Sequence, residues 1–206
     1  TRDHLQPVRY ATAEGYWYFG NNGDTPNYWK YRASYNDQSW FFETQNDAEL
    51  LIRVILDHFS TDNRTVDGDQ KVVSAIEKTY ETIHSAHSAF LLSPWGTLFA
   101  FRDPWGVRPL VFAEVDGAKY FVSESCSFDL LRIPETKWTY PEPGEIITVT
   151  TAGKLSRFPM KREKVQAPCL FEFVYFGSPN SIWHDIEIAH SRIRAGGYLY
   201  EESPVN

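Results

Sequence analysis

The chain has 206 residues, of which 42% are hydrophobic and 23% are charged. This composition is typical of a globular domain and excludes a wholly disordered chain. Its 20 basic and 27 acidic side chains give a net charge of −7, which argues against nucleic-acid binding. The longest apolar runs are too short to cross a bilayer, and the opening residues are polar and charged. We therefore expect no membrane span, no signal peptide and a cytoplasmic protein.

Cysteine and histidine usage indicates no metal or disulfide chemistry. Cys126 and Cys169 are the two cysteines, and neither belongs to a CxxC motif. We interpret both as buried, unreactive thiols in a reducing compartment. The six histidines have no metal-ligand spacing, and no glycine-rich phosphate loop occurs.

The first half of the chain predicts strands, a turn and two helices. The opening fifteen residues show neither the helical nor the strand periodicity of apolar residues. The short aromatic run at 16–19 predicts a strand. Asn-Asn-Gly-Asp at 21–24 predicts a turn. Amphipathic patterns predict helices over 47–59, with Asn46 as its N-cap, and over 70–84.

The second half predicts mainly short strands. Apolar runs at 88–92, 97–101, 109–114 and 119–123 are separated by turns that contain proline or glycine. A hairpin is predicted over 145–158, an apolar run occupies 170–176, and a last helix begins near Asp185 and ends at 196–197. A block of helices and many antiparallel strands favour α+β layers, with helices covering sheet faces.

Three places in the first helix-and-strand block carry candidate chemistry. Arg9 is either a solvated charge or a bidentate clamp for a carboxylate. Asn22 and Gly23 form either a hairpin turn or an oxyanion hole, in which an amide and a backbone N–H face a developing negative oxygen. Asp47 either stabilises a helix dipole or binds an ammonium group.

Two other interpretations are weaker. Thr1 is a candidate N-terminal nucleophile, but no apolar strand follows it to hold it rigidly. A carbohydrate-binding surface is the other interpretation, although aromatic clusters more often form core. It would use aromatic side chains in the first fifth of the chain, namely Trp17, Tyr18, Tyr28, Trp29, Trp40 and Phe41.

Taken in order, a series of segments resembles one family. The segments are VRYATA, NNGDTPNYW, FETQNDAELL, FRDPWGVRPLVF, SESCSFD, PGEIITVT and CLFEFVYFGSPNS. Together they are similar to the glutaminase domain of amidophosphoribosyltransferases, a class II glutamine amidotransferase domain of N-terminal-nucleophile type. The similarity runs over 8–194. FETQNDAELL also resembles the glutamine domains of glutamate-synthase-type proteins, which remain an alternative.

The resemblance implies an αββα sandwich of the N-terminal-nucleophile hydrolase type, with two stacked antiparallel sheets. It implies hydrolysis of glutamine to glutamate and ammonia by an N-terminal cysteine thiol. Arg9 would bind the glutamine α-carboxylate with Thr12 beside it, and Asp47 would hold the α-ammonium group. The Asn22 side chain and the Gly23 backbone N–H would form the oxyanion hole. The charged turn at 102–109 would lie near the glutamine pocket.

The chain departs from the family pattern at both ends. The family begins with Cys-Gly-Ile-Val on a strand ahead of the VRYATA segment, whereas this chain begins with Thr1. The interval 14–20 is also shorter than in the family. We therefore expect an N-terminally incomplete glutaminase domain over 1–183, without its first strand and nucleophile. We expect 184–206 to be a connecting helix that leads towards an absent phosphoribosyltransferase domain.

The resemblance implies a glutamine amidotransferase that supplies ammonia to phosphoribosyl pyrophosphate in purine biosynthesis, or to a related acceptor. The alternative is a non-catalytic module that binds glutamine or another amino acid, or that has a structural role. The implied partners are glutamine, an acceptor domain or subunit, and further copies in an oligomer. No cofactor is expected in this chain alone. In the full family protein we expect magnesium and an iron–sulfur cluster, for which Cys169 matches a ligand position.

Overall fold

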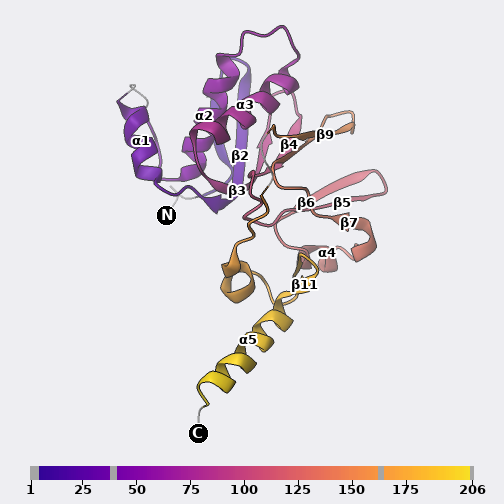
Figure 1. The fold of residues 1–206 in the computed structure, drawn as a ribbon. Coiled ribbons are helices and arrows are strands. Elements are labelled where there is room, and N and C mark those ends of the chain that lie inside the picture. Colours follow the sequence, from indigo (N-terminus) through magenta and orange to yellow (C-terminus); the bar gives the residue numbers. More distant parts are fainter. Residues whose placement is uncertain (1–4, 38–40, 162–164, 205–206) are drawn as a thin grey trace.

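The computed structural model describes residues 5–37, 41–161 and 165–204 (Figure 1). Its largest feature is a six-stranded antiparallel sheet in the order β1-β2-β3-β4-β8-β9. The strands are β1 (Val8–Thr12), β2 (Gly15–Asp24), β3 (Ala86–Leu92), β4 (Leu98–Arg102), β8 (Glu145–Val149) and β9 (Leu155–Pro159).

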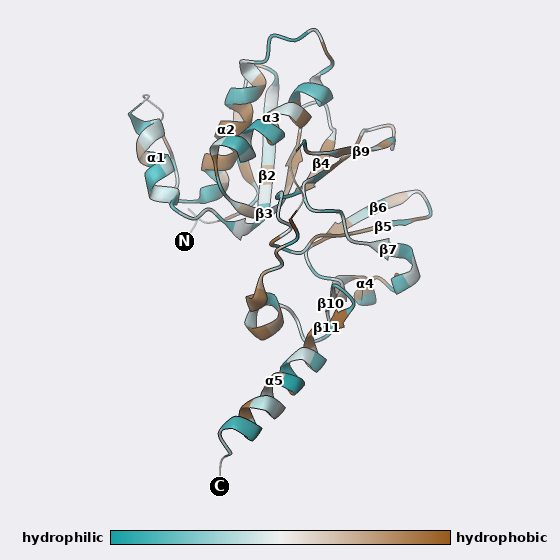
Figure 2. Ribbon diagram, in the orientation of Figure 1, coloured by the Kyte–Doolittle hydropathy of each residue, from teal (hydrophilic) through white to brown (hydrophobic). Residues whose placement is uncertain are grey.

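Two amphipathic helices, α2 (Asp47–Ser60) and α3 (Gly68–Thr82), cover one face of this sheet (Figures 1 and 2). Both sequence-predicted helices are therefore confirmed. Their apolar faces pack on inward side chains of β2, β3 and β4 in the main core. A fully buried Ile or Leu in such a core contributes about 1.5–3 kcal/mol to folding. These helices cover one face of the sheet. Polar residues of β2 that point to the other face are therefore available to form a site.

A smaller antiparallel sheet stacks on the opposite face of the first. It contains β5 (Val111–Val115), β6 (Ala118–Val122) and β7 (Trp138–Thr139). Phe90 of β3 meets Phe121 of β6 with ring centroids 6.2 Å apart. A short helix, α4 (Cys126–Leu130), inserts Phe128 beneath the outer side of this second sheet. The layers thus run helix, sheet, sheet, helix, which confirms the predicted αββα sandwich.

The remaining elements lie at the edges. They are α1 (Tyr28–Asn36), the 3-10 turn η2 (Glu135–Lys137), the π-helical turn η3 (Glu172–Phe176), β10 (Ile182–Trp183), β11 (Ile186–Glu187) and α5 (Ile188–Glu202). In Figure 1, α5 projects from the body as an arm that ends at the C-terminus. None of the described helices is long and apolar enough to span a membrane.

Three sequence predictions about elements were wrong. The turn expected at 21–24 is part of β2, because β3 pairs with it as far as Asp24 and Ala86. Strand β1 occupies a stretch in which no periodicity was found, since its pairing with β2 stabilises it. Helix α5 continues through 196–197 to Glu202 instead of ending at the two glycines. In the first two cases, hydrogen bonding to a neighbouring strand outweighed the local sequence preference.

Candidate functional site

Asn22 and Gly23 lie near the end of β2, opposite Ser88 and His87 of β3. The two strands approach so closely here that a Cβ on Gly23 would stand 2.0 Å from the Ala86 carbonyl oxygen. Only glycine fits at this distance. The predicted oxyanion pair is therefore held on a paired strand, and not on a loose hairpin turn.

The Asn22 side chain is oriented by Arg108, which lies 86 residues away in the sequence. The Arg108 Nε and Nη2 atoms donate to Asn22 Oδ1 at 3.2 and 2.7 Å. Because a guanidinium can only donate, the atom it contacts must be the amide oxygen. The Asn22 NH₂ group is therefore the part of the amide left to donate to another group.

Asp47, the first residue of α2, lies beside this pair. Its Oδ2 atom is 3.2 Å from His87 Nε2 and 3.3 Å from Thr25 Oγ1. Burial would raise the pKa of Asp47, but the hydrogen bonds and charge of His87, with the Thr25 hydroxyl, outweigh it and lower the pKa. His87 is the β3 partner of Gly23. Asp47 therefore contacts the strand partner of Gly23 on the helix-covered face of the sheet, whereas the Asn22 side chain alternates to the other face.

Arg9 lies on β1 and is paired with Tyr18 of β2. Because side chains alternate along a strand, Arg9, Tyr18 and Asn22 point to the same face of the sheet. The four residues from Tyr18 to Asn22 separate the two positions by about 14 Å along the strand. The Arg9 guanidinium lies over the Tyr16 ring, 4.9 Å from its centroid, and is exposed.

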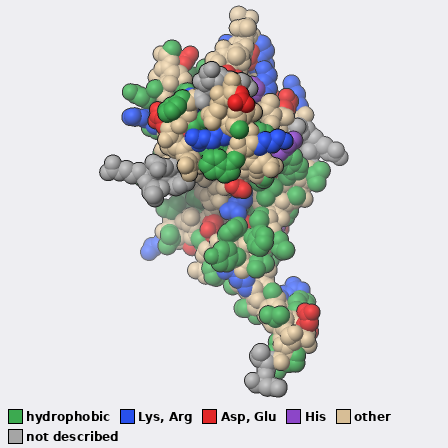
Figure 3. Space-filling model, turned by 90° about the vertical axis from the view of Figure 1, so that its left-hand side faces the viewer, with side chains coloured by type: hydrophobic (Ala, Val, Ile, Leu, Met, Phe, Trp, Pro, Cys, Tyr) green, Lys and Arg blue, Asp and Glu red, His purple; other side chains and the backbone are tan. Residues whose placement is uncertain are grey.

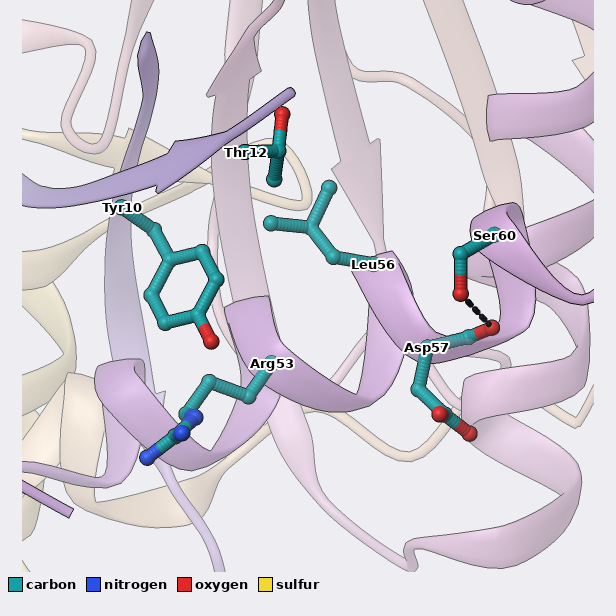
Figure 4. A pocket seen from close by; sticks show the side chains of 6 residues that line it. All are labelled: Tyr10, Thr12, Arg53, Leu56, Asp57 and Ser60. Atoms are coloured by element: carbon teal, nitrogen blue, oxygen red, sulfur yellow. Dashed lines mark hydrogen bonds between the residues drawn. The ribbon is translucent and has the colours of Figure 1, made fainter. Parts of the chain in front are cut away.

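Thr12 points to the opposite, helix-covered face. Its hydroxyl accepts a hydrogen bond from Trp17 Nε1 at 2.9 Å. With Tyr10 it borders a hollow of about 270 Å³ against α2, which Figure 4 shows together with Arg53, Leu56, Asp57 and Ser60. Thr12 is three positions after Arg9 on the same strand, so the two side chains point to opposite faces and the structure does not bring these predicted partners together.

Three of the predicted residues border separate hollows. Arg9 lines one of about 610 Å³, Asn22 one of about 470 Å³ and Asp47 one of about 420 Å³. The first two share Pro7 in their walls. The geometry therefore places Asn22, Gly23 and the Asp47–His87 pair at the same end of β2 and β3. The Asn22 side chain and the Asp47–His87 pair lie on opposite faces of the sheet and border separate hollows, and Arg9 is on the face of Asn22.

The charged turn between β4 and β5 forms a rigid support for Arg108. Buried Arg102 donates to the carbonyl oxygens of Gly106 and Pro141 at 2.8 and 2.6 Å. The Asp103 carboxylate accepts from the backbone N–H groups of Trp105 and Val107, at 2.8 and 3.1 Å. This segment lies next to Asn22, as expected for a turn near the pocket.

Sequence reasoning missed Thr25, His87 and Arg108. His87 meets Asp47 across 40 residues and Arg108 meets Asn22 across 86. Neither pair has a local spacing that a motif could reveal. The charged turn was the one signal that could have indicated Arg108. This arginine lies just after the segment 102–106, whose side-chain hydrogen bonds hold the turn in place.

The cysteines do not fit a cluster in this chain. Cys126 and Cys169 are free and half-buried. Within 5–37, 41–161 and 165–204, no group of three or more His, Cys, Asp or Glu residues could hold a metal ion. A single thiol does not hold an iron–sulfur cluster, so the described residues do not fit one.

The structure leaves the Thr1 hypothesis untested and bears only in part on the aromatic surface. Thr1 and Trp40 lie outside the described residues. Trp17 is fully buried in the core, whereas Trp29 and Phe41 are exposed. The described members of the aromatic set are thus divided between the core and the surface.

Comparison with known proteins identifies the family. A family model described as "Glutamine amidotransferase domain" matches residues 1–129. The chain belongs to this glutamine amidotransferase domain family. It is similar to the amidophosphoribosyltransferase of Archaeoglobus fulgidus, with 28% identity over 98% of the chain and 42% of the relative. The corresponding protein of Pyrococcus horikoshii is 33% identical over 89% of the chain and 38% of the relative.

The fold of this glutamine amidotransferase domain also matches a solved structure. Glutamine phosphoribosylpyrophosphate amidotransferase from B. subtilis, complexed with ADP and GMP, superposes with a TM-score of 0.80 at 22% identity. The match covers 100% of this chain and 43% of that structure. The chain thus spans less than half the length of these three similar proteins.

Proposed function

We propose that the chain is the glutaminase part of an amidophosphoribosyltransferase-like protein, which hydrolyses glutamine to glutamate and ammonia. The observation that carries this proposal is the contact between Arg108 and Asn22, which leaves the amide NH₂ group to donate beside Gly23. The Asp47 carboxylate lies at the same end of the strands, against His87, which is the β3 partner of Gly23. These groups suit an amide substrate that also carries an α-ammonium group.

Each proposed role follows from the chemistry of the group. A thiolate attacks the carboxamide carbon, a C–S bond forms and the carbonyl oxygen becomes negative. The Asn22 NH₂ and the Gly23 N–H donate to that oxygen. The nitrogen takes up a proton, which in the family the α-amine of the nucleophile carries, so the C–N bond breaks and ammonia leaves. Water then hydrolyses the thioester to glutamate and frees the thiol. In the family that the sequence resembles, the thiolate belongs to an N-terminal cysteine.

Arg9 and Asp47 select an amino acid over other amides. Asp47 keeps a negative charge for the α-ammonium group, and 21% of its side chain is exposed. Arg9 offers a planar fork for the α-carboxylate from the same sheet face as Asn22. Thr12 is left out of the proposed pocket because its hydroxyl faces α2.

The acceptor of the ammonia is proposed from the relatives, whose printed names are amidophosphoribosyltransferases. Phosphoribosyl pyrophosphate on a second domain or subunit is therefore the proposed acceptor. The exposed apolar residues of η3, among them Val174 and Tyr175, support a further domain at this end of the molecule.

The test is ammonia release from glutamine by the native protein, whose N-terminal residue is determined by mass spectrometry. We expect ammonia release and labelling of one thiol by an electrophilic glutamine analogue. Arg9→Met should raise the KM for glutamine at least tenfold, because a charged hydrogen-bond pair contributes about 1.5–3 kcal/mol. Arg132→Met, at an exposed arginine after α4, is the matched control and should leave the KM unchanged.

One outcome would contradict the glutaminase assignment, and another would contradict only the role of Arg9. Glutamine binding without ammonia release or thiol labelling would favour the non-catalytic binding module. An unchanged KM in Arg9→Met, with normal turnover, would remove Arg9 from the pocket and leave the glutaminase assignment intact.

A further inference from the structure

Arg108 stands between the proposed oxyanion hole and the C-terminal segment of the chain. Two of its nitrogens donate to Asn22 Oδ1 at 3.2 and 2.7 Å. Its third nitrogen, Nη1, forms an ion pair with Glu172 Oε1 at 2.9 Å. The guanidinium also lies 4.9 Å from the ring centroid of Phe176. One side chain thus joins β2 to the π-helical turn η3.

The backbone of Arg108 is fixed independently of its side chain. Its carbonyl oxygen accepts a hydrogen bond from the Ser88 hydroxyl at 2.9 Å and from Arg102 Nε at 3.3 Å. The turn before it is held by the Asp103 carboxylate. Removal of the guanidinium therefore leaves the main chain in place, so the side chain can be tested separately from the fold.

An oxyanion hole needs a hydrogen-bond donor at a defined point. A side-chain amide carries a donor and an acceptor, and either of them can occupy that point. Rotation of the Asn22 amide by half a turn would put its oxygen where its NH₂ group stands, and would turn attraction of an oxyanion into repulsion. Because Arg108 presents donors alone, it favours the orientation with Oδ1 inward. Among the described residues, no acceptor for the Asn22 NH₂ group is found.

We propose that Arg108 is a positioning residue that fixes the Asn22 amide with its NH₂ group towards the reacting carbonyl, and that Glu172 holds Arg108 in this role. The inference rests on the proposed glutaminase function. Glu172 is 3% exposed, so its charge is directed at Arg108 and not at solvent. The orientation of the oxyanion donor then depends on η3, a segment that the chain reaches some 150 residues after Asn22.

The test compares Arg108→Met, Asn22→Ala and the double variant in the native protein, with Arg132→Met as the control. Loss of one oxyanion donor lowers kcat by about 10²–10³-fold, so we expect a large loss in Asn22→Ala. Arg108→Met should lower kcat by about 10- to 100-fold, with the KM for glutamine within about threefold of wild type. Glu172→Gln should show a smaller loss of the same kind.

The double variant separates positioning from a general structural effect. If Arg108 acts through Asn22, the double variant should have the kcat of Asn22→Ala within about twofold. A further loss that multiplies the two single effects, or an Arg108→Met variant with unchanged kcat, would overturn the proposal. Circular dichroism spectra establish that each variant is folded.

A second measurement keeps this inference separate from the glutaminase assignment. The side-chain NH₂ resonances of Asn22, identified by their loss in Asn22→Ala, should shift in Arg108→Met and not in Arg132→Met. If the wild-type protein releases no ammonia, the proposed function fails. The resonances still decide the Arg108 contact, because unmoved signals in Arg108→Met would overturn it.

Discussion

At the scale of single residues, the contact between Asp47 and His87 determines the charge next to the Asn22–Gly23 pair. His87 is fully buried, and its Nδ1 atom has no hydrogen-bond partner among the described residues. Since a carboxylate can only accept, the contact with Asp47 requires the proton on Nε2. The Asp47 carboxylate is therefore held ionised from one side, while its exposed part faces the hollow in which α2 begins.

The lowered pKa of Asp47 predicts a pH dependence of stability. An acid whose pKa is lower in the folded state stabilises the fold above its unfolded pKa, here about 3.8, and loses this effect as the pH falls through the folded pKa. The urea midpoint of wild type should therefore exceed that of Asp47→Asn at pH 6. The difference should shrink as the pH is lowered below 3.8.

Asp69→Asn provides a comparison, because this half-buried carboxylate on α3 accepts hydrogen bonds from Trp95 and Thr97 and has no contact with His87. Its difference from wild type should not follow the same profile. A wild-type advantage over Asp47→Asn that stays constant from pH 6 to pH 2.5 would show that the hydrogen bond with His87 does not depend on the ionised carboxylate.

Several residues of the site could be predicted from the sequence, and others could not, for a geometric reason. Asn22, Gly23 and Asp47 were identified by position in a known pattern, and the structure places them at the same end of β2 and β3, with the Asn22 and Asp47 side chains on opposite faces of the sheet. Thr12 was grouped with Arg9 because the two are close in sequence, yet strand alternation puts them on opposite faces. His87 and Arg108 reach the site only through strand pairing and a folded turn, which local sequence does not encode.

At the scale of elements, the start of α2 is built as one unit with the loop that precedes it. The Asn46 side chain accepts from the Ala48 N–H at 3.0 Å and caps the helix. Buried Glu49 turns back and accepts from the backbone N–H groups of Glu43 and Thr44, at 2.8 and 2.7 Å. This unit determines where Asp47 stands relative to β3.

Replacement of the cap should therefore affect both stability and binding. Asn46→Ala removes a cap that contributes about 1 kcal/mol, so the free energy of unfolding in urea should fall by that amount. The KM for glutamine should rise as well, because Asp47 follows the cap directly. Asp67→Ala removes the equivalent cap of α3, where Asp67 accepts from the Gln70 N–H at 2.8 Å, far from the site.

The two cap variants should lose similar stability, and only Asn46→Ala should change the KM. An equal KM in the two variants would show that the start of α2 does not affect substrate binding. The α2 prediction rested on the Asn46 cap and the apolar spacing, and the α3 prediction on its apolar spacing alone; both signals lie within the helix or directly before it. No such signal marks the end of β2, since its length depends on β3, more than 60 residues later.

At the scale of the whole molecule, the C-terminal end of the sandwich carries an exposed apolar surface. The segment before α5 is coloured hydrophobic in Figure 2, and hydrophobic side chains gather above the projecting tail in Figure 3. Exposed apolar residues lie directly before η3, in η3 and in α5, and include Leu170, Phe171, Tyr175, Ile193 and Leu199. An apolar surface of this kind marks a place where another domain or chain packs.

This surface predicts that the 206-residue chain alone associates with itself. Exposed apolar side chains in water are stabilised by any contact that buries them. Replacement of Leu170, Tyr175 and Leu199 by serine should therefore lower the weight-average sedimentation coefficient at high protein concentration. Serine at Leu130 and Leu131, which are exposed at α4, provides the control at a second apolar site. If the α4 variant abolishes association and the arm variant does not, the arm is not the surface that packs against a partner.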